Sequence, residues 1–149
     1  MTTRLLFVCL GNICRSPTAE AIAKARAAGI GLEVESAGLA GWHVGEPPDP
    51  RSVKAGAARG YDLTPIRARR VRPSDFHLFD RIIAMDASNL EALRAMAPAD
   101  SRAALALVRD FAGGATGLDV PDPYYDGNFD AVIDMLEEAI DGLLAEIAA

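Results

Sequence analysis

The sequence predicts an α/β fold: a single doubly wound domain with a four-stranded parallel sheet, in the strand order 2-1-3-4, and helices on both faces. Short apolar runs without polar alternation recur along the chain, and such runs are typical of strands buried on both faces. Helical patterns separate these runs, as in units where a helix connects two parallel strands. The chain has 149 residues, 50% of them hydrophobic, which is enough for one domain with a substantial core.

The first part of the predicted fold is a strand, a turn, a helix and a second strand. Residues 5–8 form a short apolar run that predicts a central strand. Ser16 is a favoured N-cap and Pro17 suits the first helical position, so we expect a helix over residues 17–28. Residues 32–36 alternate apolar and polar side chains, which is typical of an edge strand. This unit is expected to be a right-handed crossover.

The rest of the chain begins with a long loop and ends in a strongly patterned helix. Residues 38–50 contain three Gly and three Pro, and long loops in compact domains usually serve a function. A capping-box pattern predicts a helix start at Ser88, and Asn128 is the expected N-cap of the last helix. The remaining expected elements are helices over residues 50–59, 74–78, 88–96 and 129–147, and strands over residues 81–85 and 103–108.

The turn between the first strand and the first helix has the features of an anion-binding loop. Cys9 follows the strand, and Gly11 and Asn12 are of the residue types that most readily take positive φ. A tight strand-to-helix turn points backbone N–H groups into one concavity, where the helix dipole also attracts negative charge. Arg15 can hold two phosphate oxygens at once, and together with the N–H groups it favours a Cys9 thiolate. A thiolate beneath a bound phosphoryl group is placed for in-line attack; the alternative is a buried structural cysteine and an arginine that merely starts a helix.

These residues resemble a known motif. Residues 9–17 match the pattern C-x-G-N-x-C-R-S-P, which lies near the N-terminus of low-molecular-weight protein tyrosine phosphatases. The resemblance covers nearly the whole chain, so we expect residues 1–149 to form one domain of this kind. Further segments in the order and spacing of that family are Ser36-Ala37-Gly38, Gly41-Trp42-His43-Val44-Gly45, Asp49-Pro50-Arg51, Ala84-Met85-Asp86 and Asp122-Pro123-Tyr124-Tyr125.

The resemblance implies hydrolysis of protein phosphotyrosine and of aryl phosphates, with no metal or other cofactor. Cys9 would form a cysteinyl phosphate, Arg15 would hold the phosphoryl oxygens, and the Ser16 hydroxyl would hydrogen-bond the departing thiolate. Asp122 lies between two prolines, which favour an extended, rigid loop that could present one carboxyl group to the site. Phenolate is a poor leaving group without a proton donor, and Asp122 suits the role of general acid and then base. The alternative for Asp122 is ordinary turn chemistry.

The expected substrate-binding residues come from the loop and from two later segments. The loop would contact the phosphoryl group, and aromatic side chains would form the walls of a cleft for the tyrosine ring. Trp42 could instead be a hydrophobic anchor for its own loop. The expected set is Leu10, Gly11, Asn12, Ile13, Cys14, Ser16, Trp42, Tyr124 and Tyr125.

Two positions bear on how the loop is held. Many family members carry a His that helps to hold the loop asparagine, but this chain has Ile66 there, which leaves the support of Asn12 open. Asp86 follows the expected third strand at its carboxyl end, so we expect it beside the loop in a supporting role.

Four arginines at positions 67, 69, 70 and 72 form either a solvated face or a surface that attracts an acidic phosphoprotein.

Composition limits the partners. A net charge of −6 argues against nucleic acid, and no apolar segment approaches the ~20 residues that a membrane helix needs. Without a signal-peptide pattern, we expect a cytoplasmic protein that is a monomer or self-associates weakly. The expected partner is a tyrosine-phosphorylated protein, with a tyrosine kinase as one candidate.

In a reducing compartment Cys14 either protects Cys9 through a reversible disulfide or contributes only its backbone amide.

Each alternative function has its own sequence requirements. Protein-arginine phosphatases typically have Thr in place of Ile13 and lack the paired tyrosines. Arsenate reductases of the same fold need a further cysteine downstream, and none follows Cys14. A nucleotide-binding P-loop needs a Gly-Lys-Ser/Thr ending, which is absent. A non-catalytic phosphoprotein-binding module would need neither the nucleophile Cys9 nor the acid Asp122.

Overall fold

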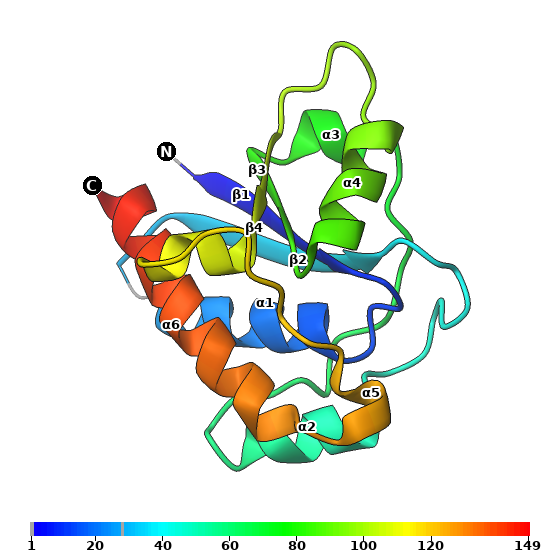
Figure 1. Cartoon of the computed structure of the whole chain (residues 1–149), viewed down its shortest axis with the longest axis vertical. Coiled ribbons are helices and arrows are strands. Elements are labelled where there is room, and N and C mark those ends of the chain that lie inside the picture. The colour runs from blue at the N-terminus through cyan, green and yellow to red at the C-terminus, as the bar shows by residue number, and fades with distance from the viewer. Residues whose placement is uncertain (1, 28) are drawn as a thin grey trace.

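The computed structural model describes residues 2–27 and 29–149. Four parallel strands form one sheet in the order β2-β1-β3-β4, with helices on both faces, which confirms the predicted fold class and strand order (Figure 1). In chain order the elements are β1 (Thr3–Cys9), α1 (Arg15–Arg26), β2 (Leu32–Gly38), α2 (Pro50–Ala57), α3 (Asp75–Leu78), β3 (Arg81–Ala84), α4 (Ala87–Met96), β4 (Ala104–Leu107), the 3₁₀-helix η1 (Val108–Ala112), α5 (Pro123–Asp126) and α6 (Phe129–Ala148).

Alternate residues of β1 point to opposite faces of the sheet. Leu5 and Phe7 pack in the cluster formed with α1 and α6, whereas Leu6 and Val8 pack in the cluster formed with α3 and α4. All four side chains are fully buried. A central strand with two buried faces explains why residues 5–8 show no polar alternation. Cys9, the last residue of β1, is thereby placed at the carboxyl edge of the sheet.

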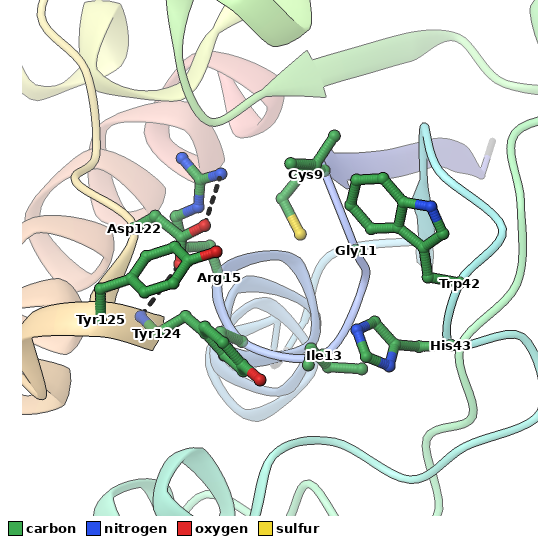
Figure 2. Close-up of a pocket in the computed structure, with 11 residues that line it drawn as sticks. Cys9, Gly11, Ile13, Arg15, Trp42, His43, Asp122, Tyr124 and Tyr125 are labelled. Atoms are coloured by element: carbon green, nitrogen blue, oxygen red, sulfur yellow. Dashed lines mark hydrogen bonds and ion pairs between the residues drawn. The ribbon is translucent and has the colours of Figure 1, made fainter.

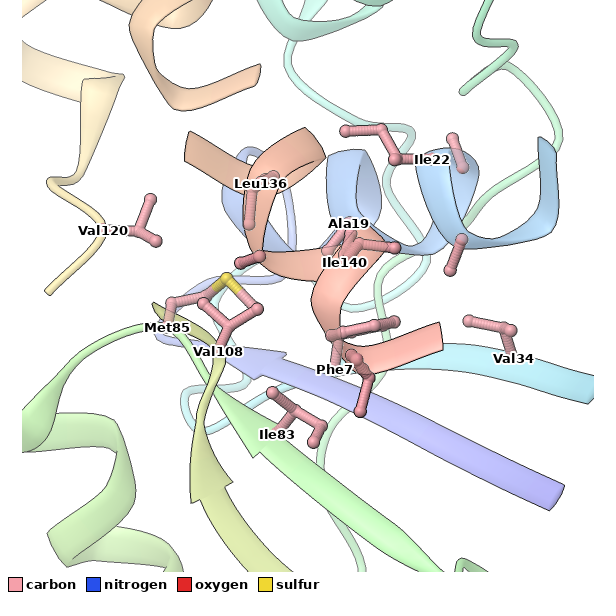
Figure 3. Packing of buried hydrophobic residues seen from close by; sticks show 14 of the residues in the cluster. Phe7, Ala19, Ile22, Val34, Ile83, Met85, Val108, Val120, Leu136 and Ile140 are labelled. Atoms are coloured by element: carbon pink, nitrogen blue, oxygen red, sulfur yellow. The ribbon is translucent and has the colours of Figure 1, made fainter. Parts of the chain in front are cut away.

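Helix α6 packs along α1 and covers one face of the sheet. Figure 3 shows Leu136 and Ile140 close to α1 and above Phe7. A Cβ added to Gly142 would lie 1.8 Å from the carbonyl oxygen of Phe111, so glycine is what lets α6 approach η1 this closely. The buried residues of α6 recur at intervals of three and four, as predicted: Phe129, Val132, Ile133, Leu136, Ala139, Ile140, Leu143 and Leu144.

The start of α1 differs from the prediction. The helix begins at Arg15, two residues earlier than expected, and Ser16 is not its N-cap. The N-cap position is Cys14, where no side chain makes a capping hydrogen bond. Ser16 does not cap the helix because it lies within the helix and its hydroxyl contacts the Cys9 sulfur and accepts a hydrogen bond from Asn12. The prediction was wrong because this side chain serves the loop rather than the helix.

Two further helix ends differ. Helix α1 ends at Arg26, and Ala28, the predicted last residue, lies outside the described residues. Helix α4 begins one residue before Ser88, and its cap is Asp86, whose carboxylate accepts a hydrogen bond from the Asn89 N–H at 2.7 Å. The predicted capping box was therefore wrong, because a better-placed carboxylate precedes it.

The other predicted boundaries agree with the structure within two residues. Three further details of the elements were not predicted. Strand β2 reaches Gly38 because Ala37 and Gly38 pair with the end of β1, a contact between segments far apart in sequence. The short helices η1 and α5 were not predicted, since four or five residues carry little periodicity. Asn128 occupies the N-cap position of α6, as expected, but its side chain makes no capping hydrogen bond.

Candidate active site

A pocket of about 200 Å³ opens at the carboxyl end of β1, where parallel sheets usually bind ligands. Figure 2 shows the Cys9 sulfur pointing into the pocket, with Asp122 and Tyr125 on one side and Trp42 and His43 on the other. Segments far apart in the chain therefore meet at this edge. The pocket is lined by Cys9, Leu10, Gly11, Ile13, Cys14, Arg15, Trp42, His43, Asp122, Tyr124 and Tyr125.

Asn12 and Ser16 are the two expected site residues that do not line the pocket. Both are buried, and both contact the Cys9 sulfur. The Asn12 backbone N–H donates to Sγ at 3.3 Å, and the Ser16 Oγ lies 3.0 Å from Sγ. When the sulfur is ionised the hydroxyl is the donor, so two hydrogen bonds stabilise the nucleophilic form.

The loop depends on one residue in the left-handed region. Asn12 has φ of 57° and is the only non-glycine residue with positive φ in the described part of the chain. Gly11, the other residue expected to take positive φ, does not. Its missing side chain instead leaves room for His43, whose Cδ2 would lie 3.3 Å from an added Cβ.

The Asn12 side chain is held on all sides. Its Nδ2 donates to the hydroxyls of Ser16 at 2.8 Å and Ser36 at 3.0 Å, and its Oδ1 accepts the Arg69 backbone N–H at 3.0 Å. Ile66 is buried and packs in the hydrophobic core. Two serines and a backbone amide therefore hold the loop asparagine in the absence of the His found in many family members.

We predict that Asn12→Ala lowers the free energy of unfolding by about 1 to 3 kcal/mol, because buried partners lose their hydrogen bonds. Asn12→Gly is the matched control: it loses the same bonds but accepts the left-handed backbone, so it should be more stable than the alanine variant by roughly 1 kcal/mol. Urea unfolding of the three proteins measures both differences. Equal stability of the two variants would show that the backbone at position 12 is not strained.

Arg15 is fixed before any ligand arrives. It is almost completely buried, and its Nη1 donates to the Asp86 carboxylate at 2.7 Å and to the Val120 carbonyl at 2.9 Å. Its Nη2 lies 3.7 Å from the Asp122 carboxylate. Burial opposes the charge on Arg15, but Cys9 and these carboxylates outweigh it and raise the pKa of Arg15 further. Asp86 lies beside the loop, as predicted, where it positions the guanidinium.

Asp122 combines a structural role with a position in the pocket. Its backbone is extended, as expected next to proline, and its Oδ1 accepts the Tyr124 N–H at 3.0 Å to cap the short helix α5. Its other carboxylate oxygen is the one near Arg15. The side chain is 38% exposed, so water can reach it. Turn chemistry and a place in the pocket are therefore compatible at this residue.

Exposed aromatic rings form the rim. Trp42 is 72% exposed, Tyr124 42% and Tyr125 89%. The two tyrosine rings meet edge to face with centroids 5.0 Å apart. Large exposed apolar side chains gathered around one pocket are typical of a binding site.

His43 is the pocket residue that the sequence reasoning missed. Its Nδ1 lies 2.7 Å from the Glu46 carboxylate, and its ring packs against Gly11. The sequence signals were its position next to Trp42 and its place in the family-like segment of residues 41–45, but nothing in the spacing of the chain predicts that this loop folds back over the anion-binding turn.

Comparison with known proteins is decisive for the family. A family model described as low molecular weight phosphotyrosine protein phosphatase matches residues 4–149. The chain belongs to this family. Low molecular weight phosphotyrosine protein phosphatases are hydrolases, and a relative from Streptomyces coelicolor, named low molecular weight protein-tyrosine-phosphatase, is 47% identical over 156 aligned residues. The alignment covers 99% of this chain and 94% of the relative.

Solved structures of the family share the whole fold. The crystal structure of YfkJ from Bacillus subtilis has a TM-score of 0.92 and 40% identity, covering 99% of this chain and 96% of that one. A crystal structure of a Drosophila arginine phosphatase has a TM-score of 0.91 and 33% identity, covering 97% and 98%. The Bacillus subtilis protein is named a low molecular weight protein-tyrosine-phosphatase and the Drosophila protein an arginine phosphatase, so the shared fold does not by itself decide between phosphotyrosine and phosphoarginine.

None of the helices in residues 2–27 and 29–149 is both long and apolar enough to cross a membrane. The same residues contain no group of three or more His, Cys, Asp or Glu side chains that could hold a metal ion.

Proposed function

We propose that this protein hydrolyses phosphotyrosine in proteins, and aryl phosphates, through a cysteinyl phosphate on Cys9 and without a metal ion. The observation that carries the proposal is the Cys9 sulfur, which lies at the bottom of the pocket with two hydrogen-bond donors at 3.0 and 3.3 Å. Arg15 and Asp122 line the same pocket. A nucleophile, a fixed cation and a carboxyl group are the parts that phosphoryl transfer from an aryl ester requires.

In the first step the Cys9 thiolate attacks phosphorus. The S–P bond forms while the bond from phosphorus to the phenolic oxygen breaks, and Asp122 gives its proton to that oxygen. Arg15 and the loop N–H groups hold the equatorial oxygens, whose charge they stabilise in the transition state. Because Asp86 and Val120 already orient Arg15, little reorganisation is needed when the substrate binds.

In the second step water hydrolyses the cysteinyl phosphate. Asp122, now ionised, takes a proton from the attacking water. The water oxygen bonds to phosphorus as the S–P bond breaks. The thiolate that leaves is received by the Ser16 hydroxyl and the Asn12 N–H, the same donors that activate it. The Asp122 side chain is suited to this exchange because it is 38% exposed and reaches solvent.

The rim favours an aromatic substrate over phosphoarginine. The aromatic residues Trp42 and Tyr124 line the pocket, where they could contact a phenol ring, and Ile13 gives the pocket an apolar side. Because one structural neighbour is an arginine phosphatase, phosphoarginine is the second candidate substrate. The test is the turnover of phosphotyrosine, phosphoserine and phosphoarginine peptides of one sequence, with a chelator present. We expect selective release from phosphotyrosine; preference for phosphoarginine would assign the second function, and no turnover of any peptide would favour a binding module.

Cys14 is the second thiol of the loop, and we propose that it protects Cys9 only slowly at neutral pH. Burial, with the nearby Asp49 and Cys9, raises the pKa of the Cys14 thiol to about 12. A disulfide forms when a Cys14 thiolate attacks an oxidised Cys9 and displaces hydroxide, so its rate follows the thiolate fraction. As long as the pH is below the pKa, the thiolate fraction increases about tenfold for each unit by which the pH is raised.

We therefore predict that the wild type regains more activity than Cys14→Ser after peroxide and reductant, with a gap that is small at pH 7 and wider at pH 9. Activity after timed exposure is the measurement. Equal recovery at both pH values would remove the protective role, and a gap independent of pH would show that the thiolate fraction does not control it.

The proposed chemistry implies a phosphorylated partner. We propose a tyrosine-phosphorylated protein as substrate, with a tyrosine kinase as one candidate, in the cytoplasm. Phosphoproteomics of cells that lack the protein would identify peptides that gain phosphotyrosine. Absence of any such gain would argue against a protein substrate in that cell.

A further inference from the structure

A shallow groove continues from the active-site pocket across its Trp42 wall. Leu10 and Trp42 line both the pocket and the groove, so the two lie next to each other. Leu39, Ala40 and Gly41, in the loop that follows β2, contribute to the groove lining. The groove is lined by Leu10, Leu39, Ala40, Gly41, Trp42 and Arg70. A substrate whose phosphotyrosine occupies the pocket has to direct its neighbouring residues along the surface beside it.

Arg70 is the charged residue of the groove, and it is held in place. The backbone on either side of it pairs with Gly38, since Gly38 donates to the Arg69 carbonyl and accepts the Val71 N–H. Its Nε donates to the Leu39 carbonyl at 3.1 Å. An added Cβ at Gly41 would lie 3.7 Å from its Cδ and 3.9 Å from its Nη1, so the side chain runs across a glycine.

The terminal nitrogens of Arg70 are available to a ligand. Within the described residues, Nη1 and Nη2 of Arg70 make no hydrogen bond, and no carboxylate lies within 4.0 Å of them. Two other arginines near the site are engaged: Arg69 pairs with Asp75 at 3.0 Å, and Arg51 with Asp49 at 2.9 Å. Arg72 is also exposed, but it does not line the groove. An exposed guanidinium with a fixed stem and free terminal N–H groups is suited to a carboxylate.

The negative charge of the whole protein makes the local positive charge of Arg70 important for an acidic peptide. The protein carries a net charge of −6, which opposes the approach of an acidic peptide. A free arginine beside the pocket offsets that repulsion locally. The apolar groove lining, with Trp42 72% exposed, offers contact to the peptide backbone and to apolar flanking atoms.

We propose that this groove binds the segment next to the phosphotyrosine, and that Arg70 selects substrates with an acidic side chain there. The proposal rests on the proposed phosphotyrosine hydrolysis and adds a specificity-determining residue to it. An extended peptide advances about 3.3 Å per residue, so the acidic side chain belongs within the first few residues beside the phosphotyrosine.

The test compares kcat/KM for three phosphotyrosine peptides of equal length: one with neutral flanks, one with three Glu before the phosphotyrosine and one with three Glu after it. We expect one acidic peptide to exceed the neutral one by roughly two- to fivefold at low ionic strength, the range for an exposed ion pair. Arg70→Gln should abolish that preference, and about 0.5 M salt should largely screen it in the wild type. Arg94→Gln, which removes an equal exposed charge on α4 outside the groove, should keep it.

The outcomes separate this proposal from the proposed function. If the wild type hydrolyses no phosphotyrosine peptide, the proposed function fails. If it hydrolyses all three equally, or if Arg70→Gln keeps the preference, the function stands and the groove proposal is overturned. Loss of the preference in both arginine variants would indicate general attraction rather than a subsite. Sedimentation provides a last check, because self-association that Arg70→Gln abolishes would make a second copy of the chain the occupant and overturn the proposal.

Discussion

Replacing Cys9 by serine should lower kcat/KM for a phosphotyrosine peptide by more than about 10⁴-fold, because an alcohol stays protonated where a thiol ionises. The contacts to the Cys9 sulfur at 3.0 and 3.3 Å stabilise a thiolate and cannot ionise a hydroxyl. The loop N–H groups and Arg15 remain in the variant. We therefore expect Cys9→Ser to keep its affinity for inorganic phosphate within a few-fold, measured by calorimetry.

Controls for this variant concern folding rather than chemistry. Cys9 is buried, so the thermal midpoint and circular dichroism of Cys9→Ser should be compared with the wild type. Loss of both phosphate binding and stability would mean that the variant reports a damaged loop. Appreciable turnover by a well-folded Cys9→Ser protein would contradict the role of Cys9 as nucleophile.

Replacing Asp122 by alanine should lower kcat/KM about 10²- to 10⁴-fold for a phosphotyrosine peptide, and much less for an aryl phosphate with a strongly activated leaving group. The physical reason is the proton: tyrosine's phenolate needs one as it leaves, while a nitrophenolate needs it far less. Steady-state kinetics on both substrates measure the difference.

Asp122→Asn is the matched control, because Asp122 also caps α5 through the Tyr124 N–H at 3.0 Å. Asparagine is an equally good N-cap, so this variant keeps the helix end while it loses the acid. We expect the two variants to lose similar activity toward the peptide. Equal losses on both substrates, or full activity in Asp122→Asn, would show that Asp122 is not the proton donor.

The parts of the fold that were predicted correctly are those with strong local signals. Residues 5–8 lack polar alternation because both faces of β1 are buried, and α6 repeats its apolar residues every three or four positions because it covers the sheet. The strand order 2-1-3-4 was predicted because helices alternate with four apolar strands, as in doubly wound domains. The lining of the pocket by Cys9, Arg15 and Asp122 matched the spacing and the resemblance together.

The errors occurred where one side chain serves a distant contact. Ser16 looks like a helix cap in sequence but holds the Cys9 sulfur, and Asp86 caps α4 while also holding Arg15. The residues that replace the usual His could not be inferred, because Ser36 and the Arg69 amide reach Asn12 from segments 24 and 57 residues away. His43 was missed for the same reason, since only the folded loop brings it over Gly11.

The cysteinyl phosphate is the most direct point to test. In Asp122→Ala, an activated, phosphorus-labelled aryl phosphate should form the intermediate readily but hydrolyse it slowly, because the base for the second step is missing. Rapid quenching should then trap about one labelled phosphoryl group per molecule, and peptide mapping should place it on Cys9. Product formation without labelled protein, or label on another residue, would contradict the proposed mechanism.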